Sequence, residues 1–263
     1  MAAESKPVRY RAGGFQPRLI KWLALFSFVA VIFVLEVLAR SGLMPPLAFP
    51  APSAIGTALV DLFQSGQIWQ HLDASLQRLA VGWGVGVSTG VVIGLVIGTN
   101  SVARSLGTPW VAAISTIPKI ALLPLFIIWF GIGEGSKYAT IAFGTFFPTV
   151  INTYGGVNNV ERSLIRMGQS FNLKRRTIVA RIILPATLPS ILSAFRISAS
   201  IGIILLVAAE MVAAQYGIGA YIIQQQNLFQ LDRLMAGVVL LMILGLLVYG
   251  LIALLEHHLL RWR

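Results

Sequence analysis

Cationic side chains crowd one segment of this chain, between Val160 and Pro185. There are six of them against the single carboxylate of Glu161, namely Arg162, Arg166, Lys174, Arg175, Arg176 and Arg181. Long apolar runs flank the segment, and Lys and Arg beside membrane spans are typical of the cytoplasmic side. The chemistry that this pattern offers is ion pairing with a cytosolic partner or, as the alternative, with anionic lipid headgroups.

Two charged residues, Lys119 and Glu210, fall inside apolar runs. An ionised side chain at the centre of a bilayer costs about 3 kcal/mol or more, so it faces a cavity or pairs with another group. Two interpretations stay open: the two side chains form an ion pair near a solute pathway, or Lys119 meets an anionic solute. We favour the pair, because isolated buried charges are rarer than paired ones.

The sequence from Gly86 to Gly90 matches the G-x-S-x-G signature of serine hydrolases, with Ser88 as the nucleophile. That signature requires a strand, a turn and a helix, whereas Ser88 lies in the middle of an apolar run. An intramembrane serine hydrolase therefore stays only an alternative. An ion channel is another alternative, but the sequence contains no repeat that resembles a selectivity filter. The sequence Gly135-Ser-Lys137 lacks P-loop spacing, so we expect any nucleotide to bind another chain.

Composition identifies the class of protein. Of 263 residues 57% are hydrophobic and 11% charged, and the mean hydropathy is +0.82, which is too apolar for an ordinary soluble domain. The net charge of +11 is concentrated at the ends of apolar runs, so it indicates a membrane protein rather than a nucleic-acid-binding one. Because there is no cysteine, disulfides and thiolate metal sites are excluded.

Six stretches are long and apolar enough to cross a bilayer, which takes about 20 residues. They are residues 22–39, 79–98, 110–130, 138–157, 186–214 and 234–255. The first is a retained anchor rather than a signal peptide, because no cleavage site follows it. A proline-rich sequence and the amphipathic residues 57–76 predict a loop outside the bilayer after it. Most Lys and Arg residues fall on the side of the basic segment, which predicts that both termini are cytoplasmic.

Small and rigid residues mark two of these spans. The second span has a glycine at every fourth position, which lines one helix face with backbone and predicts a tight helix contact: Gly82, Gly86, Gly90, Gly94 and Gly98. Whether the partner helix belongs to this chain or to a second copy stays open. Pro118 and Pro124 interrupt the third span, and breaks at membrane depth are tolerated where backbone is buried in protein or lines a cavity.

The basic segment itself has the pattern of two short helices. Val160, Leu164, Met167 and Phe171 recur at helical spacing and predict an amphipathic surface helix. Asn172 follows where that helix must stop, and asparagine accepts the left-handed conformation found at helix ends. A second helical run begins at Lys174 and leads to the prolines at the start of the fifth span.

In this segment Arg166-Met167-Gly168, Asn172 and Ile182-x-Leu184-Pro185 have the spacing of a known signature. The signature is the cytoplasmic loop of permease subunits of bacterial ATP-binding-cassette (ABC) importers, which the chain resembles from about residue 76 to its end. The segments 129–137, 206–211 and 216–219 are similar to the nitrate, sulfonate and taurine branch of that family. The family favours Glu-Ala-Ala where this chain has Arg166-Met167-Gly168, and Gly where it has Asn172. Arg166 therefore has the opposite charge to the glutamate that the family favours.

The resemblance implies an all-α membrane protein, a polytopic helical bundle of about six spans with the type I ABC importer transmembrane fold. It implies the inner membrane as location, and as partners a second copy of the chain, two ATPase subunits that bind ATP and magnesium, and an external solute-binding protein. It implies neither a catalytic residue nor a cofactor in this chain. The loop residues that would contact the ATPase are Arg162, Arg166, Met167, Gly168, Phe171, Asn172, Leu184 and Pro185.

The expected organisation follows from these assignments. Residues 1–21 and 257–263 are cytoplasmic tails, residues 22–75 hold the first span and the external loop, and residues 76–256 form the transport core with its coupling loop at 160–185. We expect the chain to carry a small anionic solute of the nitrate, sulfonate or taurine type, with Lys119 and Glu210 as candidates for its pathway. An importer for a heterocyclic vitamin precursor is the alternative within the same family.

Overall fold

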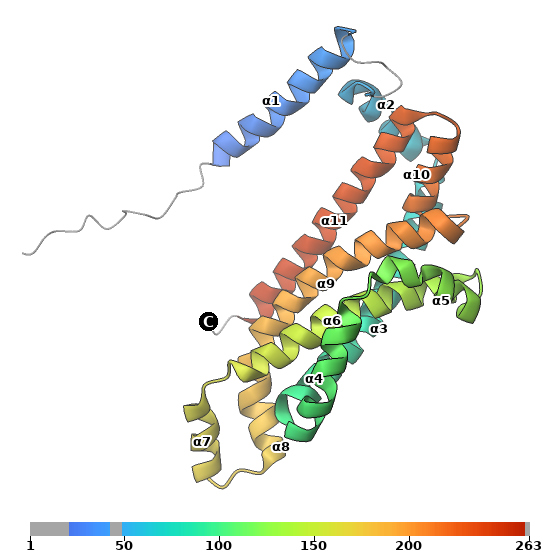
Figure 1. Ribbon diagram of the computed structural model, residues 1–263. Coiled ribbons are helices and arrows are strands. Elements are labelled where there is room, and N and C mark those ends of the chain that lie inside the picture. Colours follow the sequence, from blue (N-terminus) through green and yellow to red (C-terminus); the bar gives the residue numbers. More distant parts are fainter. Residues whose placement is uncertain (1–20, 43–48, 261–263) are drawn as a thin grey trace, which may run out of the picture. The chain divides into compact units, whose positions relative to one another are not determined.

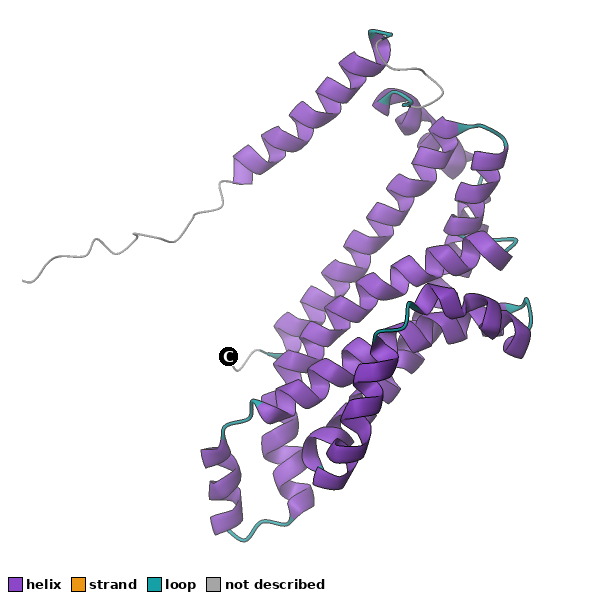
Figure 2. Cartoon of the chain, in the orientation of Figure 1, coloured by secondary structure: helices purple, strands orange, loops and turns teal. Residues whose placement is uncertain are grey.

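The computed structural model describes residues 21–42 and 49–260, and this part of the chain consists of helices joined by turns, with no strand (Figure 2). The all-helical class expected from the sequence is therefore confirmed. Of the predicted tails, residues 1–20 and 261–263 lie outside the described part. The elements are α1 (Lys21–Arg40), α2 (Pro52–Gln64), α3 (Gln67–Thr99), α4 (Ser101–Ser115), η1 (Lys119–Leu122), α5 (Leu123–Phe130), α6 (Glu134–Asn158), α7 (Arg162–Ser170), α8 (Arg175–Ile178), η2 (Val179–Ile183), α9 (Leu184–Ala213), α10 (Ile218–Asn227) and α11 (Leu231–Leu259).

The chain divides into two compact units, residues 1–53 and 54–263. In the first unit, α1 exposes large apolar side chains along its length. The carboxylate of Glu36 accepts hydrogen bonds there from Arg40 Nε at 2.5 Å and from the backbone nitrogen of Ser53 at 2.9 Å. The second unit contains the helices from α3 onward, and the candidate sites described below lie within it.

Glycines bring α3 and α6 into backbone contact in the second unit, where α3, α6 and α9 lie side by side (Figure 1). A Cβ atom added at Gly82, Gly90, Gly94 or Gly98 would lie 2.6–2.8 Å from a Cβ atom of α6, closer than real Cβ atoms approach. A Cβ atom added at Gly86 would likewise lie too close to Thr145 and Ala142 of α6. The partner that the sequence left open is therefore α6 of the same chain.

Helix α6 is buried between α3 and α9, and its buried polar residues are mostly threonines. The hydroxyl groups of Thr140, Thr145 and Thr149 donate to the carbonyls of Ser136, Ile141 and Thr145 at 2.7–2.8 Å, four residues earlier on the same helix. Their hydrogen-bonding capacity is met within α6, so these side chains can be buried at a close helix contact without a polar partner on α3 or α9.

By length and apolar composition, three helices of the described part could cross a membrane: α3, the helical stretch Arg175–Ala213, and α11. A fourth candidate is the bent pair formed by α4 and the segment Lys119–Phe130. The predicted count of six spans is not confirmed by this criterion, because α6 does not meet it. For α6 the physical reason is its burial, since a helix enclosed by other helices needs fewer apolar residues than one facing lipid.

The interruption predicted for the third span is confirmed. Helix α4 ends at Ser115, and the following 3-10 helix and α5 continue at an angle of 88° to it. The break coincides with Pro118, which has no N–H to continue the ladder, while Pro124 lies in the first turn of α5, where a missing N–H is tolerated. Lys119 is the first residue after the bend.

The close contact between α3 and α6 generates the first prediction. Gly90→Ala places a methyl group 2.8 Å from Thr149 Cβ and 2.9 Å from the carbonyl oxygen of Phe146. We expect this variant to lose about 1–3 kcal/mol of unfolding free energy through overpacking. The matched control is Gly84→Ala on the same helix, which meets no atom within 4 Å and should be neutral or slightly stabilising. Denaturant unfolding in micelles measures both, and equal stability of the two variants would contradict the packing account.

Candidate functional site

Helices α7 and α8 form an elbow at one end of the second unit, between α6 and α9 (Figure 1). The predicted amphipathic helix is present as α7, and Val160, just before it, is buried. The other three residues of its apolar stripe are exposed: Leu164 at 39%, Met167 at 50% and Phe171 at 72%. An exposed apolar stripe on an otherwise basic helix is typical of a surface that contacts another protein or a membrane.

The turn between α7 and α8 has the predicted backbone conformation. Asn172 has a φ of 54°, in the left-handed region, as expected from the sequence. Its backbone N–H donates to the carbonyl of Gln169 at 2.9 Å, and the N–H of Leu173 donates to the carbonyl of Gly168 at 3.1 Å. These two bonds are those of a Schellman motif, which ends a helix and sharply turns the chain.

Apolar contacts hold the elbow against the start of the next span. Gly168 is buried, and a Cβ atom there would lie 2.9 Å from Ile182 Cδ1 and 3.3 Å from Ile178 Cγ1. Val160 and Ile178 also belong to a buried cluster with Val157, at the end of α6. Helix α7 is thus packed against the segment that leads into α9, in addition to being joined to it by the turn at Asn172.

From the elbow an uninterrupted helical stretch runs from Arg175 to Ala213, 39 residues in all. It begins as α8, widens to the π-helix η2, and continues as α9. The wider turns coincide with the approach to Pro185 in the first turn of α9, which cannot donate an α-helical hydrogen bond. Leu184 and Pro185, predicted for the coupling loop, therefore lie at the junction between the elbow and the span.

Lys119 and Glu210 are not paired, and the prediction of an ion pair between them is wrong. The amino group of Lys119 donates to the carbonyl of Ser115 and lies 5.5 Å from the centre of the Phe147 ring. None of the ion pairs within the described ranges includes Lys119. The physical reason is that Glu210 already has a closer cationic partner, Arg78 of α3.

The side chain of Glu210 is fully buried and has three hydrogen-bond donors. Its Oε1 accepts from Ser75 Oγ at 2.7 Å and from Arg78 Nη1 at 2.8 Å, while Oε2 accepts from the backbone nitrogen of Gly219 at 2.8 Å. A Cβ atom at Gly219 would lie 2.7 Å from the carbonyl oxygen of Val207, so only glycine lets this amide approach the carboxylate. The buried charge is therefore both paired and hydrogen-bonded, as burial requires.

Arg78 joins this carboxylate to a second one. Its Nε and Nη2 donate to the two oxygens of Glu134 at 2.6 and 2.8 Å, and Nη1 also donates to the carbonyl of Tyr216 at 2.5 Å. Lys137 Nζ lies 3.3 Å from Glu134 Oε1. We call Arg78, Glu134, Lys137 and Glu210 the charge cluster; it has two cations and two anions, and it ties α3, α6 and α9 together.

The two carboxylates of the charge cluster differ in exposure. The side chain of Glu134 is 46% exposed, whereas that of Glu210 is 0% exposed. Glu134 precedes the predicted span 138–157, and the hydrogen bonds from Arg78 hold its pKa below the ordinary value of 4.5. Arg78 and Lys137 were not among the predicted site residues. A usable signal existed, because Arg78 lies four residues before Gly82 and extends the glycine register that faces α6.

The arrangement around Ser88 does not support hydrolytic chemistry. Ser88 and His71 lie on the same helix, α3, seventeen residues apart, which is about 25 Å along the helix axis. His71 Nδ1 is 2.9 Å from the carbonyl oxygen of Gly217 and 3.1 Å from its nitrogen. In the part of the chain that the structure describes, no three His, Cys, Asp or Glu side chains are placed to hold a metal ion.

Comparison with known proteins gives a consistent result. The family described as "Binding-protein-dependent transport system inner membrane component" matches residues 89–261. The "Putative aliphatic sulfonates transport permease protein SsuC" of Bacillus subtilis strain 168 is 32% identical over 263 residues, covering 100% of this chain and 92% of that protein. The "Taurine transport system permease protein TauC" of Escherichia coli K12 is 30% identical over 259 residues, covering 93% and 94%.

A solved structure has the same fold. It is an inward-facing conformation of the MetNI methionine ABC transporter, which aligns with a TM-score of 0.58 at 20% identity and covers 74% of this chain and 95% of that one. At this identity the similarity concerns the fold alone.

The charge cluster generates the second prediction. Glu210→Gln removes a fully buried charge and leaves Arg78 less compensated, and breaking a buried ion pair costs about 3–5 kcal/mol. Glu134→Gln affects a half-exposed partner and should cost less than about 1 kcal/mol at neutral pH. Denaturant unfolding in micelles measures both, and a loss for Glu134→Gln as large as that for Glu210→Gln would contradict the assignment.

The pH dependence provides a control. Because the pKa of Glu134 is lowered on folding, its stabilising effect is present above about pH 4.5 and is lost as the pH falls through the lower folded-state pKa. Wild type and Glu134→Gln should therefore converge in stability on acidification.

Proposed function

Because the chain belongs to the family of binding-protein-dependent transport system inner membrane components, we propose that it forms the path through which a separate ATPase drives solute import. It is a transport subunit and not an enzyme, as its relatives are named transport permeases. It is a multi-pass membrane protein of the type I ABC importer fold. The observation that carries the proposed coupling is the elbow: an exposed apolar stripe on a basic helix, packed against the start of a long span.

The elbow is the proposed contact with the ATPase. Met167 and Phe171 would enter an apolar groove of that subunit, and Arg166 would meet carboxylates at its edge. An acidic partner is proposed because the chain has arginine where the family favours glutamate. ATP and magnesium would bind only to the ATPase, since the chain has no phosphate-binding loop.

Motion of the elbow would reach the far end of the protein through its packing. Gly168 fits closely against Ile178 and Ile182, so a displaced α7 displaces the start of the stretch Arg175–Ala213. That stretch contains Glu210, which is bound to Arg78 of α3. Closure of two ATPase subunits could thus tilt α9 against α3 and α6, and this would switch which side of the membrane the pathway faces.

The proposed solute is a small anion of the sulfonate or taurine type. Relatives named for aliphatic sulfonates and taurine support this class. In the chain itself, Lys119 lies at the bend of the broken span and is in none of the ion pairs of the described residues. A cation at such a position is a suitable contact for a passing sulfonate, and Phe147 would hold its amino group in place. Glu210 contributes to the pathway only indirectly, by positioning α9.

The proposed assembly contains two copies of this chain, two ATPase subunits and an external solute-binding protein. Its N- and C-termini would lie in the cytoplasm together with the elbow, because most Lys and Arg residues fall on that side of the predicted spans. The charge cluster would then lie near the opposite side.

The third prediction concerns the turn of the elbow. Asn172→Pro fixes φ near −65°, whereas the turn requires 54°, and it removes the N–H that donates to Gln169. We expect ATP-driven uptake and copurification of the ATPase to fall about tenfold or more, with normal amounts in the membrane. Asn172→Gly is the matched control and should retain both, because glycine accepts the left-handed region. Unchanged uptake and copurification in the proline variant would rule out the proposed contact.

The fourth prediction concerns the solute. Lys119→Gln removes the cation at the bend, and we expect taurine or alkanesulfonate uptake below saturation to fall about tenfold, since a hydrogen bond to a charged group contributes about 1.5–3 kcal/mol. Lys119→Arg keeps the charge and should retain most of the uptake. Initial rates of radiolabelled uptake in proteoliposomes measure this. If Lys119→Gln transports at the rate of wild type, Lys119 is not a solute contact.

A further inference from the structure

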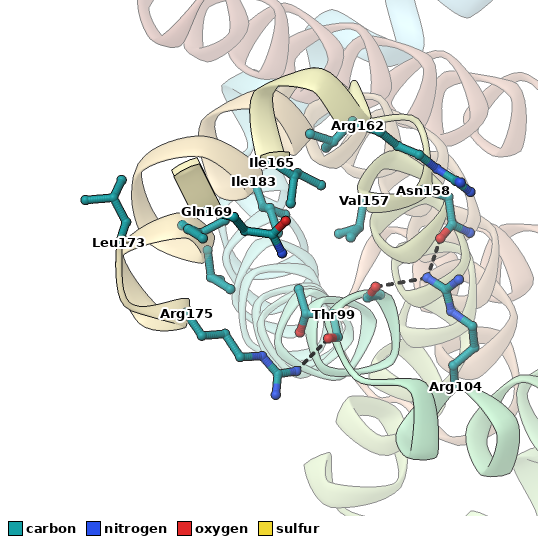
Figure 3. Close-up of a pocket in the computed structure, with 14 residues that line it drawn as sticks. Thr99, Arg104, Val157, Asn158, Arg162, Ile165, Gln169, Leu173, Arg175 and Ile183 are labelled. Carbon is teal, nitrogen blue, oxygen red and sulfur yellow. Dashed lines mark hydrogen bonds between the residues drawn. The ribbon is translucent and has the colours of Figure 1, made fainter. Parts of the chain in front are cut away.

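A cavity of about 520 Å³ lies between the elbow and the adjoining ends of α3 and α4 (Figure 3). Three arginines from three different elements line it: Arg104 of α4, Arg162 of α7 and Arg175 of α8. Much of the remaining lining is aliphatic, with Val157, Ile165 and Ile183 among its residues. The cavity thus combines an apolar wall with three cations, and none of the described residues that line it has a carboxylate.

The guanidinium groups in this cavity keep much of their hydrogen-bonding capacity. Arg104 donates to the carbonyls of Ile97 and Gly98 and to the side-chain oxygen of Asn158, and Arg175 donates to the carbonyl of Thr99 at 2.6 Å. These bonds complete the end of α3, where backbone carbonyls lack partners. Each guanidinium has five N–H donors, so several donors of the three groups remain available. None of the ion pairs in the described ranges includes any of the three arginines.

The neighbouring surface indicates where the cavity lies relative to lipid. Val92, Val96 and Val102 are between 49% and 68% exposed on α3 and α4, directly before and after the end of α3. Exposed aliphatic side chains of this kind can contact lipid acyl chains. At the end of α3 the exposed valines are followed by the arginines that line the cavity. This is the pattern expected at the boundary between hydrocarbon and water, where basic pockets between helices bind lipid headgroups.

We propose that this cavity is a binding site for a phosphoryl anion, and that its ligand is the headgroup of an anionic phospholipid such as phosphatidylglycerol or cardiolipin. The three arginines would bind the phosphate oxygens, which suit the planar guanidinium group. The aliphatic wall would contact the glycerol and the first acyl carbons, a contact that inorganic phosphate cannot make. The bound headgroup would join the end of α3 to α7 and α8, and so stiffen the elbow; the site does not depend on the proposed docking of an ATPase.

The test uses the full chain, with any subunits that copurify, in detergent micelles titrated with phosphatidylglycerol, cardiolipin or phosphatidylcholine and observed by native mass spectrometry. We expect anionic lipid to bind at least about tenfold more tightly than phosphatidylcholine, because each surface cation contributes about 1 kcal/mol. Arg162→Gln should weaken the anionic lipid about fivefold. Within the described part of the chain its side chain forms no ion pair and no hydrogen bond, so the fold should be unaffected.

Two further variants keep the test specific. Gln169→Glu adds a carboxylate to the lining at nearly constant shape and should weaken binding about as much as Arg162→Gln. Arg176→Gln is the matched control, since Arg176 is an exposed arginine of the same segment that does not line the cavity. It should bind lipid as wild type does. Equal binding of phosphatidylcholine, or equal loss in Arg176→Gln, would overturn the site.

Competition identifies the source of the phosphoryl group. Inorganic phosphate at millimolar concentration should not displace the anionic lipid, because it lacks the contact with the aliphatic wall. Complete displacement would assign the cavity to free phosphate and overturn the lipid as ligand. A purified ATPase subunit that displaces the lipid would show that the arginines belong to a protein interface, and would also overturn the proposal.

Discussion

A single helical stretch, Arg175–Ala213, joins the elbow to the fully buried carboxylate of Glu210, and the rest of the structure depends on its continuity. Within a bilayer a helix cannot break freely, because each unpaired backbone group would cost several kcal/mol. In the proposed coupling, the stretch would carry a displacement at α8 toward α9, apart from what the π-helix η2 absorbs. Packing at Gly168 extends the same constraint to α7, where the apolar stripe is exposed.

The second unit also resists separation of its central helices. The glycine face of α3 admits the backbone of α6, and Arg78, one step further along the same register, binds carboxylates from α6 and α9. Dispersion between closely packed backbones and a satisfied buried ion pair act at adjacent points of one interface. Glu134 is the exposed member of the charge cluster and Glu210 the enclosed one, so the ion pair of Arg78 with Glu210 is better protected from water than its ion pair with Glu134.

Features determined locally could be predicted from the sequence, and pairings across helices could not. The break at Pro118 and the left-handed turn at Asn172 follow from the residues themselves and are present. The glycine register predicted a close contact, yet only the fold identifies α6 as the partner. The partner of Glu210 was wrongly predicted, because only the packing of α3 against α9 brings Arg78 beside its carboxylate. The count of six spans is not confirmed at α6, because this helix is half buried by other helices and is less apolar than a helix that faces lipid.

The central claim is that the elbow contacts a cytosolic ATPase and moves with it. The chain has no cysteine, so Phe171→Cys provides a single attachment point for a photo-crosslinker at a side chain that is 72% exposed. The decisive measurement is the crosslinked product in native inner membranes, with and without ATP. The account predicts an adduct with the ABC ATPase whose yield changes when ATP binds. An adduct with lipid alone, together with labelling of the cysteine by a membrane-impermeant reagent added from outside, would contradict it.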